Sequence, residues 1–249
     1  MRGALADESL RVHYQPQISL VDGQVFGVEA LARWRHPRLG EVEPAVFLEL
    51  AQNGGIALAV DAYVQNRALA DAAEWQRQGF NVAVSINISP AQIKQANFLD
   101  DFQQRLQRAE VAPSMVKAEL VETALLDGAD DILNKLQGVK ALGVELAIDD
   151  FGTGYSSLSY LQQFPIDWLK IDKTFVAELK QSGNSVLVDA ILAMGKGLGM
   201  KLIAEGVEHR EQLDYLRNNG CNAVQGFLLA PALAKDELST LLNKQISRR

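Results

Sequence analysis

The sequence predicts an α/β fold, namely a TIM-like (β/α)8 barrel with an irregular start. Short apolar runs rich in β-branched residues alternate with longer helical patterns, which is typical of βα units in a parallel sheet. Roughly eight such runs follow one another without a linker, as a barrel of this kind requires. A short turn between the first two runs predicts that they form an antiparallel hairpin. A doubly wound open sheet is the alternative.

The predicted elements follow in chain order. The strands are Val12–Ile18, Val25–Trp34, Val82–Ile88, Met115–Val121, Glu145–Ile148, Trp168–Ile171, Lys201–Ala204 and Ala223–Gly226. The helices between them include Ala45–Gln52, Leu58–Gln78, Asp130–Leu142, Val186–Leu198 and Glu211–Asn218. Only Ser19–Gln24 separates the first two strands, and its Asp22-Gly23 pair favours the tight turn of a hairpin.

The composition argues against several classes of function. With 24 basic and 31 acidic residues, the formal net charge of -7 argues against general binding to nucleic acids or anionic membranes. A phosphorylated ligand is compatible with this charge, because bound divalent cations can outweigh it. The single cysteine, Cys221, is interpreted as a small buried apolar residue. No apolar run reaches the ~18 residues of a membrane span and the N-terminus does not resemble a signal peptide, so we expect a cytoplasmic protein.

Polar residues recur where the predicted strands end, which is where a barrel places its reactive groups. They are Glu29, Asn87, Glu119, Glu122, Asp149, Asp150, Lys170, Glu205 and Gln225. Each alone has a plain structural interpretation, because such groups often cap helices, satisfy loop backbone or, for Lys170, form an ion pair. Their recurrence at successive strand ends favours a shared site.

A ring of carboxylates predicts bound cations, because without them the acids repel one another and their pKa values rise. Carboxylate and amide oxygens are the ligands that Mg²⁺ or Mn²⁺ prefers. The three histidines, His13, His36 and His209, lack the spacing of a zinc site.

The segment Asp149–Ser157 carries two adjacent carboxylates followed by Gly152 and Gly154. Neighbouring side chains of a strand point to opposite sides, but both carboxylates can face the same cations if the backbone turns there. The glycines permit that turn and a mobile loop. The loop could also cradle a phosphate, although it lacks the P-loop and dinucleotide-binding motifs. The preceding acids favour metal chemistry.

The chain resembles the EAL domain family in eight motifs that follow in order from about Leu10 to about Leu238. The motifs are Tyr14-Gln15-Pro16, Glu29-Ala30-Leu31 with Arg33-Trp34 and His36-Pro37, Asn87-Ile88-Ser89, Glu119-Leu120-Val121-Glu122, Asp149 through Tyr160, Leu169-Lys170-Ile171-Asp172, Ala204-Glu205-Gly206-Val207-Glu208 and Gln225-Gly226-Phe227. The resemblance implies a bacterial signalling enzyme that hydrolyses the second messenger cyclic di-GMP to linear pGpG with two divalent cations.

The resemblance also implies which residues bind the metal ions, Mg²⁺ or Mn²⁺. Ligands of the first ion would be Glu29, Asn87, Glu119 and Asp149. Asp149 would bridge to the second ion, and Asp150 would be a further ligand of that ion.

Roles in catalysis and substrate binding follow from the same resemblance. Lys170 would orient or help activate the attacking water, and Gln225 would support the water and the metal ligands. Glu205 would act near the second metal, either as a ligand or as the general base. Gln15 and Arg33 would contact the guanine and the phosphate of the substrate.

The resemblance implies that residues 10–249 form one phosphodiesterase domain. Residues 1–9 form a lead-in, where Ala4–Val12 has the pattern of a short amphipathic helix. Such segments join EAL domains to upstream sensory or GGDEF domains, so we expect an excised C-terminal domain of a larger regulator. Glu122 is expected to hold the loop Asp150–Ser157, and a homodimer is expected through the region near that loop.

Some positions depart from the family pattern, and none of them is an expected metal ligand. They are Glu49, Gln52, Val121 and Ala230. The alternative function is a catalytically silent cyclic di-GMP receptor or a protein-interaction module. Such domains typically lack acids of the motifs above, so the complete set in this chain favours catalysis. An unrelated metal hydrolase on the same fold is the weaker alternative.

Overall fold

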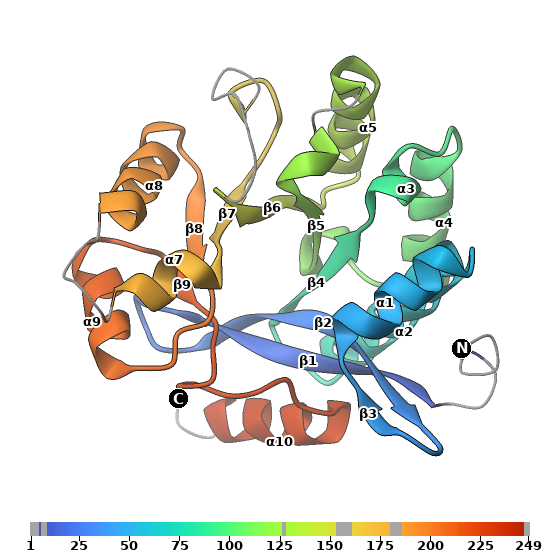
Figure 1. Cartoon of the computed structure of the whole chain (residues 1–249), viewed down its shortest axis with the longest axis horizontal. Coiled ribbons are helices and arrows are strands. Elements are labelled where there is room, and N and C mark those ends of the chain that lie inside the picture. The colour runs from blue at the N-terminus through green and yellow to red at the C-terminus, as the bar shows by residue number, and fades with distance from the viewer. Residues whose placement is uncertain (1–4, 6–8, 126–127, 153–160, 180–185, 247–249) are drawn as a thin grey trace.

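Parallel strands and intervening helices close into a barrel in the computed structural model, which describes residue 5 and residues 9–125, 128–152, 161–179 and 186–246 (Figure 1). The strands are β1 Leu10–Ser19, β2 Val25–His36, β3 Gly40–Val42, β4 Ala83–Ile88, β5 Val116–Val121, β6 Glu145–Phe151, β7 Trp168–Ile171, β8 Lys201–Ala204 and β9 Ala223–Val224. They lie in the order β1-β9-β8-β7-β6-β5-β4-β2-β3. An additional pairing of β1 with β2 closes the ring and leaves β3 outside it. The predicted barrel is confirmed, and the open sheet is excluded.

The hairpin of β1 and β2 makes the start of the barrel irregular, as predicted. β1 runs antiparallel to both of its neighbours, β2 and β9, whereas the pairings from β2 through β4 to β9 are parallel. In the turn, Gly23 adopts a φ of 71°, a left-handed conformation that glycine tolerates best. Gln15 lies opposite Glu29 in this hairpin, which brings two predicted site residues together.

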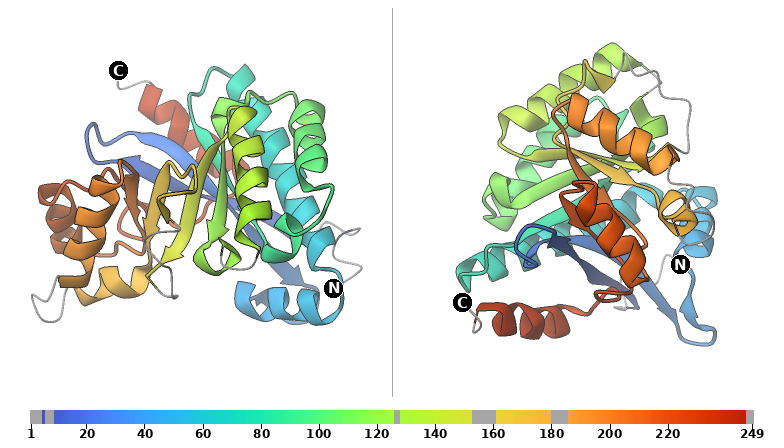
Figure 2. Two further views of the ribbon diagram at one scale, coloured as in Figure 1. Left: turned by 90° about the horizontal axis from the view of Figure 1, so that it is seen from above. Right: turned by 90° about the vertical axis from the view of Figure 1, so that its left-hand side faces the viewer.

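Helices surround the barrel on its outer side (Figure 2). The longer ones are α1 Pro44–Asn53, α2 Ala57–Arg77, α4 Phe98–Ala109, α5 Ala129–Ala141, α8 Val186–Gly197, α9 Arg210–Asn218 and α10 Lys235–Ile246. Short helical segments are α3 Pro90–Ile93, α7 Lys173–Glu178 and the 3₁₀ turns Pro113–Met115 and Glu122–Leu125. The helices predicted between the strands are confirmed to within a residue or two at each end.

Alternation along the strands separates an apolar outer layer from a polar interior. On β7, Leu169 and Ile171 belong to the main hydrophobic core between barrel and helices. Lys170 lies between them in sequence and points to the other side, where it meets carboxylates. The side chains that could do chemistry therefore gather inside the barrel.

The predicted lead-in helix Ala4–Val12 is wrong at its carboxyl end. Leu10, Arg11 and Val12 belong to β1, where Leu10 and Val12 are buried and Arg11 between them is exposed. This period of two is the pattern of a strand, and pairing with β2 up to Trp34 stabilises it. Residues 1–4 and 6–8 lie outside the described residues.

Two further expectations from the composition can be compared with the structure. Cys221 is buried, and burial raises the pKa of its thiol to about 11, as suits a structural residue. Within the described parts of the chain, every helix is too short or too polar to cross a membrane.

Candidate functional site

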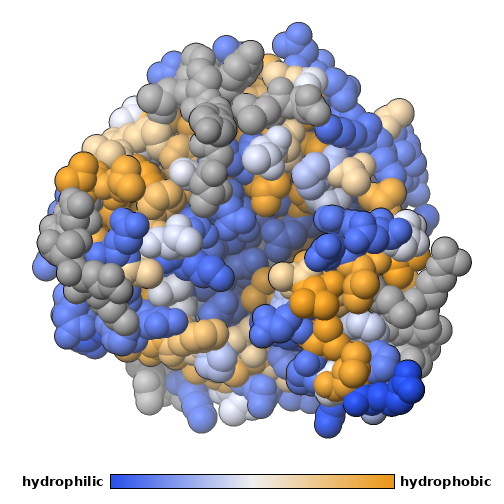
Figure 3. Space-filling model, in the orientation of Figure 1, coloured by the Kyte–Doolittle hydropathy of each residue, from blue (hydrophilic) through white to orange (hydrophobic). Residues whose placement is uncertain are grey.

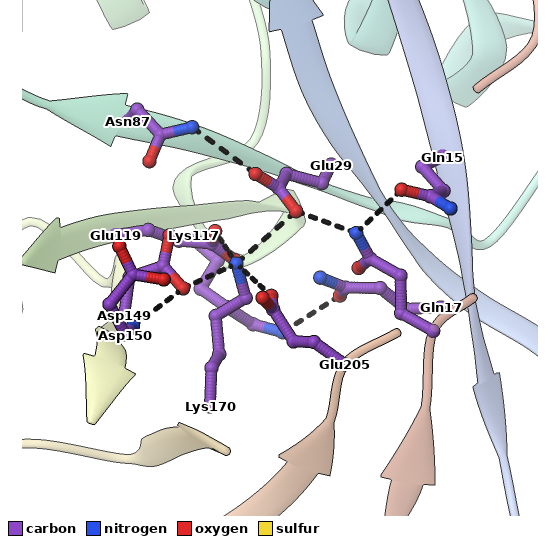
Figure 4. A network of polar contacts seen from close by, with 11 residues as sticks. Gln15, Gln17, Glu29, Asn87, Lys117, Glu119, Asp149, Asp150, Lys170 and Glu205 are labelled. Atoms are coloured by element: carbon purple, nitrogen blue, oxygen red, sulfur yellow. Dashed lines mark hydrogen bonds and ion pairs between the residues drawn. The ribbon is translucent and has the colours of Figure 1, made fainter. Parts of the chain in front are cut away.

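The polar residues predicted from the strand ends meet inside the barrel at the carboxyl ends of its strands (Figure 4). A hollow at the centre of the molecular face in Figure 3 is lined by hydrophilic residues. Opposite this end, the barrel interior is filled by a small apolar cluster that includes Ala147, Trp168 and Ile203. The site is thus a polar layer with an apolar floor beneath it.

Lys170 lies at the centre of this layer with its side chain fully buried. Its Nζ lies 3.2 Å from Glu29, 2.6 Å from Glu119, 2.9 Å from Asp149 and 2.7 Å from Glu205. Although burial alone lowers the pKa of a lysine, these four carboxylates raise the pKa of Lys170 well above its ordinary value. Lys170 is therefore a permanent cation in this site.

Glu29 is held by three different elements. Its Oε2 accepts hydrogen bonds from Gln225 Nε2 at 2.7 Å and from Lys170 at 3.2 Å, and its Oε1 accepts one from Asn87 Nδ2 at 3.3 Å. Burial raises the pKa of Glu29, but these donors outweigh that effect and lower it. Gln225, which directly follows β9, also donates to Gln15 Oε1 at 3.1 Å and so contacts both strands of the hairpin.

Asp149 and Asp150 face the same region because the strand is irregular at this point. The register between β6 and β7 shifts between Ile148 and Phe151, and Asp150 adopts a left-handed φ of 53°. Both carboxylates consequently come within reach of Glu205, which is the result expected from a backbone turn at this point. Burial and the neighbouring Asp149 raise the pKa of Asp150 to about 6.

The carboxylates form two groups that share one member. Ligand oxygens of Glu29, Glu119 and Asp149 lie within 4.8 Å of one another, and the same holds for Asp149, Asp150 and Glu205. Glu119 Oε1 is buried without a hydrogen-bond partner, and burial raises the pKa of this carboxyl despite the nearby Lys170. Five acids around one ammonium leave excess negative charge and a free oxygen, which fits divalent cations bound by oxygen ligands.

The remaining predicted residues lie at the edge of this cluster. Glu122 accepts a hydrogen bond at 2.9 Å from the backbone N–H of Gly152, which is the start of the predicted loop. Residues 153–157 of that loop, and with them most of the expected dimer region, lie outside the described residues. Arg33 is not brought into the carboxylate cluster; it donates to the carbonyl of Ala32 and, with Asn87, lines a cavity of about 370 Å³.

Sequence reasoning missed several polar residues that support the site. Lys117 is buried on the same strand as Glu119, one layer beneath it. The sequence offers one indication of this role, namely that the lysine precedes a predicted metal ligand by two positions. Gln65 is buried on α2 and contacts the backbone of Asn87, but a glutamine inside a helical pattern gave no signal. Asp172 lies within a quoted motif; its side chain accepts a hydrogen bond from Thr174 N at the start of α7.

Comparisons with known proteins agree with this arrangement. The family model of the EAL domain matches residues 1–232. The chain is 38% identical over 244 residues to the cyclic di-GMP phosphodiesterase NbdA of Pseudomonas aeruginosa, covering 97% of this chain and 31% of that protein. It is 37% identical over 238 residues to the cyclic di-GMP phosphodiesterase PdeR of Escherichia coli, covering 94% of this chain and 36% of that protein. The chain thus spans about a third of the length of these relatives.

A solved structure supports the same relationship. The PaMucR phosphodiesterase in its c-di-GMP complex superimposes with a TM-score of 0.92 at 38% identity, covering 95% of this chain and 97% of that chain. The sequence motifs, the closed barrel and the carboxylate cluster at its mouth point in the same direction. The chain belongs to the EAL domain family.

Proposed function

We propose that this chain hydrolyses cyclic di-GMP to linear pGpG as a metal-dependent phosphodiesterase. The observation that carries the proposal is the pair of carboxylate groups that share Asp149. Two cations bridged by one carboxylate suit the displacement of an oxygen from a phosphodiester. Relatives over nearly the whole chain bear the name of this activity, which supports the same substrate.

Two divalent cations, Mg²⁺ or Mn²⁺, would occupy these groups. The first would be held by Glu29, Asn87, Glu119 and Asp149, and the second by Asp149 and Asp150 with Glu205 beside it. When bound, such ions lower the pKa of a water molecule and neutralise charge on the phosphate oxygens. They also offset the excess negative charge of the site, which on its own repels a phosphodiester.

The other residues would orient the reactants. Lys170 contacts carboxylates of both groups, so it can hold them in place and direct a water molecule toward the phosphorus. Gln225 directly follows β9, which β1 separates from β2, and from there it fixes Glu29. Glu205 would accept the proton of the attacking water, or would complete the ligand set of the second ion.

Substrate contacts would come from the rim of the site. Gln15 of the hairpin is linked to Gln225 and lies opposite Glu29, where a guanine edge could reach its amide. Arg33 lines the cavity beside Asn87 and would bind a phosphate. Glu122 would hold the loop Asp150–Ser157 through its hydrogen bond to Gly152.

The alternative is a receptor that binds cyclic di-GMP without cutting it, or a protein-interaction module. All predicted ligands are present and face one another, which favours catalysis. We further propose that the chain is part of a longer regulatory protein, since its relatives are about three times as long. A homodimer is proposed from the resemblance to EAL domains.

A product assay tests this function. Purified protein is incubated with cyclic di-GMP and Mg²⁺ or Mn²⁺, and the nucleotides are separated by chromatography. Glu29→Ala and EDTA are expected to abolish the appearance of pGpG, because each removes part of the metal site. Tight cyclic di-GMP binding without product would support the receptor, and wild-type turnover by Glu29→Ala would contradict the metal site.

A further inference from the structure

Asn87 lies near the end of β4, where only one of the two neighbouring strands still pairs with it. The ladder between β4 and β5 continues through Asn87–Glu119 to Ile88–Leu120, whereas the ladder between β2 and β4 ends with the pair Glu29 and Ser85, two residues before Asn87. The Asn87 side chain is exposed, and the structure gives it one hydrogen bond, a long one of 3.3 Å to Glu29. The location of its amide must therefore be set mainly through the backbone.

Gln65 of α2 supplies a backbone contact at this point. Its side chain is 1% exposed, and its Nε2 donates to the carbonyl oxygen of Asn87 at 2.8 Å. A backbone carbonyl only accepts hydrogen bonds, so the nitrogen of the Gln65 amide must face Asn87. The contact connects a helix outside the barrel to the strand end that carries a predicted metal ligand.

Gln92 of α3 locks the Gln65 amide. Gln65 Nε2 donates to Gln92 Oε1 at 2.8 Å, and Gln92 Nε2 donates back to Gln65 Oε1 at 2.8 Å. Both N–H groups and the carbonyl of Gln65 are thus used. One turn earlier on α2, Asp61 accepts a hydrogen bond at 2.6 Å from Ser89, the residue that caps α3.

We propose that Gln65, locked by Gln92, is a positioning residue that fixes Asn87 at the cation site. A buried glutamine pair is a costly way to join a helix to a strand, because apolar residues would pack there without desolvating two amides. Its benefit lies in geometry, since metal ligands depend on the groups that orient them. The inference rests on the proposed function, which makes Asn87 a ligand.

The experiment measures Mn²⁺ binding to metal-free protein by titration calorimetry, together with the midpoint of thermal unfolding without metal. The variants are Gln65→Met and Gln92→Met, which keep side-chain length but remove the amide. Gln245→Met is the matched control, because Gln245 also clamps backbone, at Val25 N and O, at the far end of β2. Asn87→Ala reports on the ligand itself.

Gln65→Met is expected to weaken Mn²⁺ binding by about tenfold, the usual effect of losing a group that orients a ligand. Gln92→Met should give a smaller loss, because Gln65 can still reach Asn87. Gln245→Met should lower the unfolding midpoint and leave Mn²⁺ binding unchanged.

The inference is overturned if Gln65→Met and Gln92→Met bind Mn²⁺ like the wild type while Asn87→Ala binds it more weakly. The glutamine pair would then serve packing alone. If Asn87→Ala also binds Mn²⁺ normally, the proposed ligand set is at fault, and the inference falls with it.

Discussion

Two lysines inside the same barrel have opposite electrostatic surroundings. Lys170, in the layer at the carboxyl ends of the strands, contacts four carboxylates, and its pKa is raised. Lys117, one layer below, lies 4.2 Å from the ring centre of Trp168 and 5.1 Å from that of Phe26. Its Nζ donates to Gln17 at 3.3 Å, and burial lowers its pKa to about 8.

Burial penalises the charge of both lysines, so their partners decide the outcome. The upper layer holds more negative charge than Lys170 can neutralise, and this excess suits divalent cations. The lower layer offers Lys117 ring faces and an amide oxygen, which solvate an ammonium only in part. The concentrated charge of the barrel interior thus lies in the layer at the carboxyl ends of its strands.

Replacing Lys170 should have the largest effect. Lys170→Met leaves four carboxylates facing one another, so we expect the metal-free protein to lose about 3–5 kcal/mol of stability. Hydrolysis of cyclic di-GMP should fall by about 10²–10³-fold. Mn²⁺ should restore part of the stability, because cations take over the missing charge. Urea unfolding with and without Mn²⁺ measures this.

The control for that experiment is Lys201→Met. Lys201 is largely exposed, and its Nζ lies 3.6 Å from Glu145 and 4.8 Å from the ring centre of Trp168, so its loss should change stability by no more than about 1 kcal/mol. Equal stability of Lys170→Met and Lys201→Met without metal would show that the carboxylates do not depend on the central cation.

Replacing Lys117 should change the stability in the opposite direction, toward a more stable protein. Lys117→Met has a similar length and removes a buried charge that forms no ion pair with the carboxylates of the described residues, so we expect a gain of about 1–2 kcal/mol at pH 7. The folded pKa is below the unfolded one, so the unfolded wild type binds more protons between about pH 8 and 10.5. Wild-type stability should therefore rise through this window relative to Lys117→Met.

Denaturant titrations of both proteins at pH 7 and pH 10 test this expectation. The advantage of Lys117→Met should shrink at the higher pH. A variant that is less stable than the wild type at pH 7 would mean that the rings and Gln17 solvate the ammonium fully.

The smallest effect should come from Phe26, which lies where the register between β1 and β2 shifts and stacks on Trp168. Phe26→Leu removes one ring from Lys117. We expect Phe26→Leu to lower the stability more in the wild-type background than in the Lys117→Met background. The difference should be about 0.5–1 kcal/mol, which is the contribution of the cation–π contact. Identical losses in the two backgrounds would mean that the ring acts by packing alone.

Much of the fold and site follows from local patterns in the sequence. Strand alternation and turn residues predict the barrel, the hairpin and the side of β7 that carries Lys170. The strand-end acids predict the cluster, because strand ends meet at one edge whatever the details of packing. The turn at Asp150 was expected from the glycines after it and is observed as a left-handed residue.

The rest depends on contacts between distant segments. The short strand β3 forms because β2 continues beyond the barrel and pairs with it, and no local pattern specifies that pairing. Leu10–Val12 fit a helix when taken alone, and only β2 makes them a strand. Gln65 and Gln92 look like ordinary helix residues until α2 and α3 bring them together.

The presence of two cations in the carboxylate layer is the central claim, and anomalous diffraction from crystals grown with Mn²⁺ tests it most directly. We expect two manganese peaks that share Asp149. One should lie among Glu29, Asn87 and Glu119, and the other beside Asp150 and Glu205. A map without manganese in this layer, with Lys170 still contacting all four carboxylates, would contradict the claim.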